Sequence, residues 1–122
     1  MDKQEIEIYF NNQQVIDQLL RQLEKDLELE SNCLLCNSSE ANIFDSIFKL
    51  LLPIVEKNIH QDYGKFMNTL YRIDVSEQKI KQSMLDKSSI EFPCVMTELI
   101  LQKEMQKIII RLVYANRNNP SN

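Results

Sequence analysis

The sequence predicts an all-α protein, a single-domain bundle of four to five helices over residues 1–122. Three observations favour this fold class. Gly64 is the only glycine of the chain, whereas β-hairpins depend on glycine-containing turns. Apolar residues recur at helical intervals along most of the sequence. With 122 residues, of which 43% are hydrophobic and 26% charged, the chain has an ordinary globular composition and can bury one core.

The first eleven residues have no clear helical period. The stretch "EIEIYF" places Ile6, Ile8 and Phe10 in alternation, which is typical of a strand. Its plausible partner within the chain is "SIEF" at 89–92, and an isolated two-stranded ribbon is only marginally stable. We therefore expect residues 1–11 to form an N-terminal arm or a first helical turn packed on the bundle. A strand offered to another molecule is the alternative.

The segment after this arm has the clearest helical pattern. Its apolar residues recur at intervals of three and four, which places them on one face of a helix. They are Val15, Ile16, Leu19, Leu20, Leu23 and Leu27. Asn11 or Asn12 is suited to be the N-cap. The turn-like residues that follow Glu30 predict the end of the helix there.

Three further helices are predicted before the last one. Ser38 or Ser39 can cap a strongly apolar helix. Pro53 either kinks that helix or ends it at the preceding residue. A short helix follows over 61–73, and Ser76 is suited to cap a fourth helix, "EQKIKQSML".

The last predicted helix begins at Pro93, a favoured first-turn residue, and runs to about Ala115, with a disordered tail at 117–122. Apolar residues lie on two of its faces. Either this helix is central in the bundle, or one face packs against another chain. The face that we predict as an interface consists of Leu101, Met105, Ile108, Ile109 and Leu112.

The distribution of charge excludes some classes of partner. The formal net charge is −4, and residues 1–60 hold 5 basic and 11 acidic residues, against 9 and 7 in residues 61–122. Neither half is basic enough for a general nucleic-acid binder. The N-terminus lacks the apolar core of a signal peptide, and the apolar runs are too short to span a bilayer. We expect a cytoplasmic protein with no nucleic-acid or membrane partner.

Cys33 and Cys36 form a Cys-x-x-Cys motif. A structural zinc ion needs four ligands, usually supplied as two close pairs. The chain can supply four with His60 and Cys94, but these two are isolated in the sequence. A thioredoxin-like redox site would follow a strand, and no such pattern precedes the motif. We therefore expect no metal ion and no cofactor, with a thiol- or metal-dependent regulator as the alternative.

The residues between the two cysteines support a structural interpretation. Leu34 and Leu35 are expected to plug a loop between helices, with the cysteines half-buried beside them as small hydrophobic residues. Catalytic signals are also missing. His60 and Asp62 could act as a general base, but no nucleophile or glycine-rich loop accompanies them. We expect that the protein is not an enzyme.

Two C-terminal segments carry a resemblance to known proteins. "LYRIDVSEQKIKQ" (70–82) and "ELILQKEMQKIIIR" (98–111) resemble segments of small uncharacterised helical proteins of Bacteroidota. The resemblance covers the C-terminal half and implies a cytosolic helical protein without a described activity. Together these observations predict a non-enzymatic protein–protein interaction module, bound to a protein partner or to a second copy of itself through the last helix.

Overall fold

The computed structural model describes residues 12–36, 42–86 and 91–118. This part of the chain is all-α, and it contains no strand. The helices are α2 (Gln13–Asp26), α3 (Ile43–Gln61), α4 (Tyr63–Ile73), α5 (Glu77–Asp86) and α6 (Phe92–Asn118). The predicted single-domain helical bundle is therefore confirmed. The predicted N-terminal arm and its possible strand pairing lie outside the described residues.

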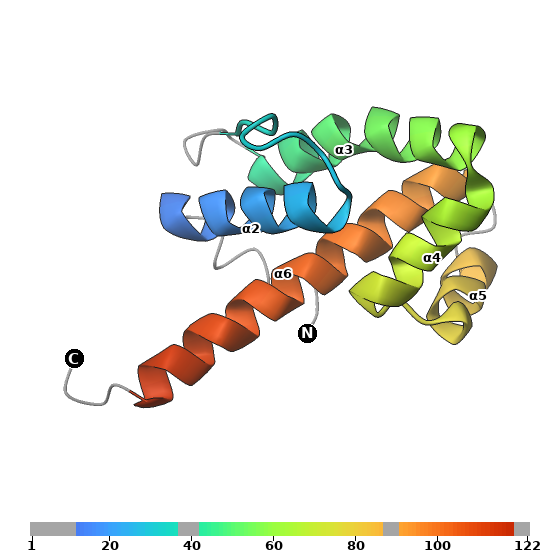
Figure 1. Ribbon diagram of the computed structural model, residues 1–122. Coiled ribbons are helices and arrows are strands. Elements are labelled where there is room, and N and C mark those ends of the chain that lie inside the picture. The colour runs from blue at the N-terminus through green and yellow to red at the C-terminus, as the bar shows by residue number, and fades with distance from the viewer. Residues whose placement is uncertain (1–11, 37–41, 87–90, 119–122) are drawn as a thin grey trace.

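Helix α6 is the central element of the bundle. It contacts each of the other four helices, and Figure 1 shows it running diagonally beneath α2 and α3, with α4 and α5 beside its N-terminal half. Its C-terminal turns project beyond the other helices (Figure 1). Its apolar residues therefore meet several neighbours in its first half and fewer toward its end.

This central position corrects the predicted interface. Leu101, Met105, Ile108 and Ile109 are buried in the core of the single chain, and Leu112 is half-buried against it. The sequence left two arrangements open for this helix: a central position in the bundle, or one face packed against another chain. The structure has the central helix, because α6 packs against each of the other four helices.

Helix α2 begins where the sequence predicts and ends earlier. The Asn12 side chain accepts a hydrogen bond from the backbone N–H of Gln14, which confirms it as the N-cap. The helix ends at Asp26 and not near Glu30, because Glu28 adopts a left-handed backbone with φ 57°. The backbone N–H of Leu29 then returns to the carbonyl of Glu24 at 2.8 Å, a helix ending usually built with glycine.

Helix α3 differs from its prediction at the start. Its cap is Asn42, whose side chain accepts from the backbone N–H of Asp45. The predicted caps Ser38 and Ser39 lie outside the described residues. Pro53 neither ends the helix nor separates it into two elements. Its ring is exposed.

Two of the remaining helix starts have side-chain caps. Asp62 caps α4, and the predicted cap Ser76 accepts from the backbone N–H of Lys79 at the start of α5. Helix α6 runs to Asn118, so the predicted tail from 117 begins too early. In the described parts of the chain, no helix has the length and apolar character needed to cross a membrane.

Candidate functional site

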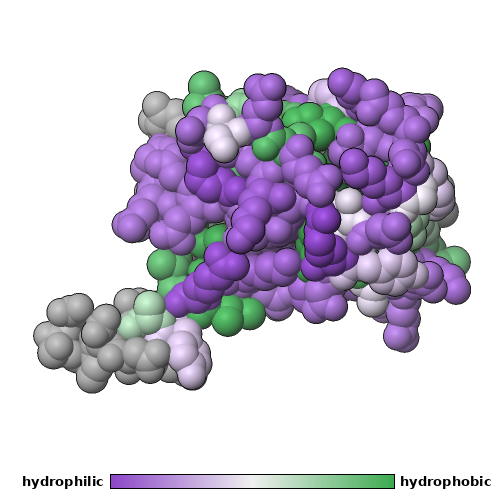
Figure 2. All heavy atoms as spheres, in the orientation of Figure 1, coloured by the Kyte–Doolittle hydropathy of each residue, from purple (hydrophilic) through white to green (hydrophobic). Residues whose placement is uncertain are grey.

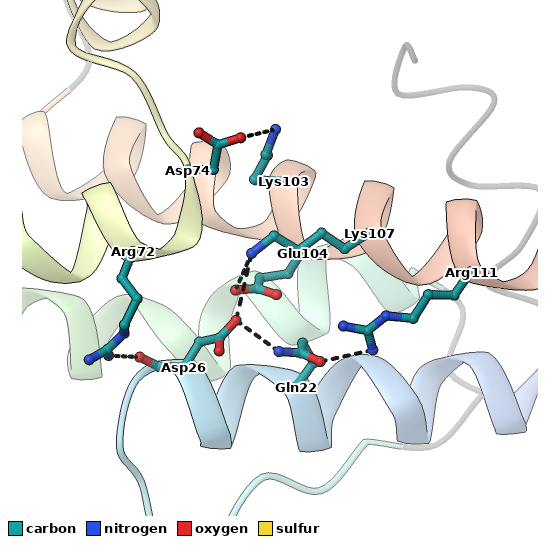
Figure 3. Close-up of polar contacts among 8 residues, drawn as sticks. All are labelled: Gln22, Asp26, Arg72, Asp74, Lys103, Glu104, Lys107 and Arg111. Atoms are coloured by element: carbon teal, nitrogen blue, oxygen red, sulfur yellow. Dashed lines mark hydrogen bonds and ion pairs between the residues drawn. The ribbon is translucent and has the colours of Figure 1, made fainter.

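A pair of carboxyl groups, buried Glu104 and half-buried Asp26, lies where α2 crosses α6. Glu104 of α6 is 0% exposed, and Figure 3 shows its carboxylate facing that of Asp26 at the end of α2. The Lys107 ammonium lies 3.9 Å from an Asp26 oxygen and 4.0 Å from a Glu104 oxygen. Within the described residues neither Glu104 oxygen has a hydrogen-bond donor by geometry, so the two carboxyl groups can bond only by sharing a proton.

Polar side chains extend this pair along the α2–α6 contact (Figure 3). The Gln22 amide donates to an Asp26 carboxylate oxygen at 2.9 Å. Its carbonyl accepts from the Arg111 guanidinium at 3.0 Å. Arg72 of α4 donates to the backbone carbonyl of Asp26. Side chains from three helices therefore meet at the C-terminal end of α2.

The surroundings shift the pKa values of the two carboxyl groups in opposite directions. Burial, followed by the hydrogen bond and the negative charge of Asp26, raises the pKa of Glu104 to about 8, against the opposing charges of Lys107 and Arg111. Burial also raises the pKa of Asp26, but hydrogen bonds from Glu104 and Gln22 and the charges of Lys107 and Arg72 outweigh it and lower that pKa. The raised pKa of Glu104 favours its protonated form, and the lowered pKa of Asp26 favours its carboxylate.

Paired carboxyl groups with separated pKa values are also found in acid–base catalysis. Catalysis additionally needs a cavity that brings a substrate to them. Three surface cavities have water-accessible volumes of about 280, 170 and 630 Å³. Neither Asp26 nor Glu104 lines any of the three.

A second buried glutamate positions the loop after α2. Glu24 is 4% exposed, and its carboxylate accepts the backbone N–H groups of Asn32 and Leu34, each at 2.9 Å. The Arg21 guanidinium lies 3.0 Å from the same carboxylate and donates to the Leu34 carbonyl at 2.6 Å. These bonds fold the loop back on α2 and bury the Leu34 side chain.

The Cys-x-x-Cys segment lies in this loop. The prediction that two leucines fill this loop is confirmed for Leu34, which is buried, and is wrong for Leu35, which is 74% exposed. Cys33 is exposed, whereas Cys36 and Cys94 are half-buried and no disulfide joins the three cysteines.

The four possible zinc ligands, Cys33, Cys36, His60 and Cys94, are not brought into one cluster. Nowhere in 12–36, 42–86 and 91–118 do three or more His, Cys, Asp or Glu residues group to hold a metal ion. The thiol-dependent alternative stays a prediction.

The projecting end of α6 carries exposed apolar side chains. Ile110 is 56% exposed and Tyr114 is 65% exposed. They are four residues apart and lie on one side of the helix. Figure 2 shows apolar surface where α6 leaves the body of the bundle. Leu112 and Val113 lie beside them, half-buried. The spacing i, i+4 was present in the sequence, but only the neighbours of α6 decide which stripe is covered.

Comparison with known proteins adds no assignment. No protein-family model, curated protein or solved structure matches the chain.

Proposed function

We propose that this chain is a non-enzymatic, cytoplasmic protein–protein interaction module that self-associates through the projecting end of α6. The observation that supports the proposal is the exposed pair Ile110 and Tyr114, here called the α6 tip. The partner is a second copy of the chain. The cytoplasm is proposed because all three cysteines are thiols, as in a reducing compartment.

The α6 tip continues a face that the chain itself covers further back. On this face Leu99, Lys103 and Gln106 line the cavity between α6 and the turn before α5. Leu99 is buried there. Ile110 follows Gln106 by four residues and therefore lies on the same side of the helix. Beyond Gln106 the α4–α5 pair no longer lines this face, so the apolar side chains reach solvent.

The basic side chains of α6 that the structure describes from Lys103 onward have partners within the chain. Lys103 pairs with Asp74 at 3.5 Å, Lys107 is held between Asp26 and Glu104, and Arg111 donates to Gln22 (Figure 3). These contacts lower the charge repulsion between two copies whose tips meet.

A second copy suits this surface because a two-fold pairing needs only one self-complementary patch. Apolar side chains meet apolar side chains when two tips cross. A stable interface buries about 800 Å² on each partner, and two exposed side chains with their half-buried neighbours supply only part of that area. We therefore expect a weak dimer, whose population rises with protein concentration.

The test measures the self-association of three glutamate variants by sedimentation equilibrium over a wide range of protein concentration. Ile110→Glu places a charge at the exposed tip and is expected to leave a folded monomer. Leu85→Glu is the matched control, because Leu85 is 80% exposed on α5, and it should dimerise as the unchanged chain does. Ile109→Glu, at a fully buried position, should instead unfold the domain, since it buries an unpaired charge.

Three outcomes decide the matter. Association that is lost in Ile110→Glu and kept in Leu85→Glu supports the proposal. Association that is equal in all folded variants, or a chain that is monomeric at every concentration, refutes self-association through this surface. Far-UV circular dichroism of each variant separates loss of association from loss of fold.

A further inference from the structure

We propose that the contact between α2 and α6 is a proton-dependent latch. One proton, shared by Asp26 and Glu104, holds the end of α2 against the middle of α6. When solvent removes that proton in mildly alkaline conditions, the buried Glu104 carboxylate faces the half-buried Asp26 carboxylate and the contact loosens. The latch uses residues distinct from the α6 tip, so it does not depend on the proposed self-association.

The first support is the position of the two groups. Asp26 is the last residue of α2 and Glu104 lies near the middle of α6, so the shared proton joins segments far apart in the sequence. Glu104 is fully buried, and water cannot take over the role of the missing donor. In the protonated state the Glu104 hydroxyl donates to the Asp26 carboxylate, and Lys107 balances the remaining negative charge.

The second support is the set of charges around the pair. Asp26 from α2 acts against ionisation of Glu104, and Lys107 and Arg111 from α6 favour it. Arg72 from α4 acts on Asp26, and Lys103 is directed to Asp74. After loss of the proton, two negative charges share the Lys107 ammonium at 3.9 and 4.0 Å. One lysine at these distances does not compensate a buried carboxylate and a half-buried one.

The direction of the pH dependence follows from the raised pKa of Glu104. That pKa is about 8 in the folded chain, against an ordinary value of 4.5. Stability from this group is therefore complete below pH 4.5 and declines as pH rises toward 8. Over this interval the folded state holds one proton more than the unfolded state. The folding equilibrium constant consequently falls about tenfold per pH unit through this group.

The test uses Glu104→Gln, whose amide can donate to Asp26 but cannot ionise. Urea unfolding at a series of pH values gives the folding equilibrium constant of both proteins. We expect the folding equilibrium constant of the unchanged chain, divided by that of the variant, to fall about tenfold per pH unit between about pH 5 and pH 8. Glu98→Gln, on a half-exposed part of the same helix, is the control and should keep the slope of the unchanged chain.

Two local measurements separate a latch from a general loss of stability. Carbon NMR of the unchanged chain should show Glu104 titrating well above the other glutamates. Amide exchange should show protection in α2 falling relative to α4 as pH rises past neutrality, and Glu104→Gln should abolish that difference. A Glu104 titration near 4.5, parallel slopes in the unchanged chain and Glu104→Gln, or a uniform loss of protection over all helices would each overturn the latch.

Discussion

Glu24 and Glu104 are both buried glutamates. Among the described residues, Glu24 accepts hydrogen bonds from two backbone N–H groups and Glu104 accepts none. Glu24 faces a loop whose backbone supplies two N–H donors, and Arg21 adds a third contact. Glu104 faces the C-terminal end of α2, where the backbone N–H groups are already bonded within the helix. Its hydrogen-bond partner there is a second carboxyl group, that of Asp26. Burial alone therefore does not decide what a charged residue contributes.

Irregular backbone is the better partner for a buried carboxylate. A loop can turn two free N–H groups toward one side chain, as Asn32 and Leu34 do for Glu24, while the N–H of Cys33 between them donates to the Glu30 carbonyl. The end of α2 offers Glu104 no free N–H group. Burial there raises the pKa of Glu104, and this gives α2 and α6 a titratable contact.

The largest effect is expected from Glu24→Met. Methionine has a similar length and no acceptor for the N–H groups of Asn32 and Leu34, so these remain unpaired. We expect a loss of about 3–5 kcal/mol in the free energy of unfolding, measured by urea denaturation. Glu30→Met, at an exposed position in the following loop, is the control. Equal stability of the two variants would contradict the role assigned to Glu24.

A smaller loss is expected from Leu34→Ala. Leu34 is buried and Leu35 is exposed, so the same change at the two adjacent positions separates core packing from loop composition. Thermal unfolding should show a loss of about 2–4 kcal/mol for Leu34→Ala and less than about 0.5 kcal/mol for Leu35→Ala. Similar losses at both positions would mean that the loop is not fixed by the Glu24 contacts.

The substitution Asp26→Asn is expected to change titration more than stability. It removes the negative charge that opposes ionisation of Glu104, so the Glu104 pKa should fall below about 8. Carbon NMR of the glutamate carboxyl groups measures this directly. An unchanged Glu104 titration would show that burial alone sets its pKa.

Asp26→Asn also tests how the stability of the protein depends on pH in acid. Because the pKa of Asp26 is lowered from 3.8, its contribution to stability is present above pH 3.8 and is lost as pH falls through the folded value. Asp26→Asn should remove that loss of stability, so the free energy of unfolding of the variant should fall less steeply as the pH is lowered in acid. Stability of the unchanged chain should therefore be highest in weak acid, between the titrations of the two groups.

The smallest effect is expected from Glu104→Met at about pH 6, where Glu104 is protonated. A flexible apolar side chain can replace a buried carboxyl group that has no backbone donor, within about 1 kcal/mol. At about pH 9 the variant should be the more stable protein, because it has no buried charge. Urea unfolding at both values checks this, and a loss as large as that of Glu24→Met would remove the contrast between the two glutamates.

Parts of the fold could be predicted because their signals are local. The apolar stripe from Val15 to Leu27 and the caps Asn12 and Ser76 depend only on neighbouring residues. The end of α2 could not be predicted in this way. The chain ends α2 and α4 with left-handed Glu28 and Asp74 in place of glycine, so the usual marker of a helix end is missing.

The candidate site depends on contacts between elements distant in the sequence. Nothing near Glu104 in the sequence indicates that Asp26 will face it, since 77 residues separate them along the chain. In the same way, Ile109 and Ile110 are identical residues side by side, and one is buried while the other is 56% exposed. The position of the other four helices around α6 makes that choice.

The helical class, the apolar stripe of α2 and two of the caps could be predicted from the sequence, because helix formation and capping follow from residues within one or two turns. The three-dimensional arrangement was needed to show that the predicted interface on α6 is core, that the α6 tip is exposed, and that the pKa of Glu104 is raised. Exposure and pKa depend on which groups surround a side chain in space, and a periodic apolar pattern on a helix does not specify its neighbours.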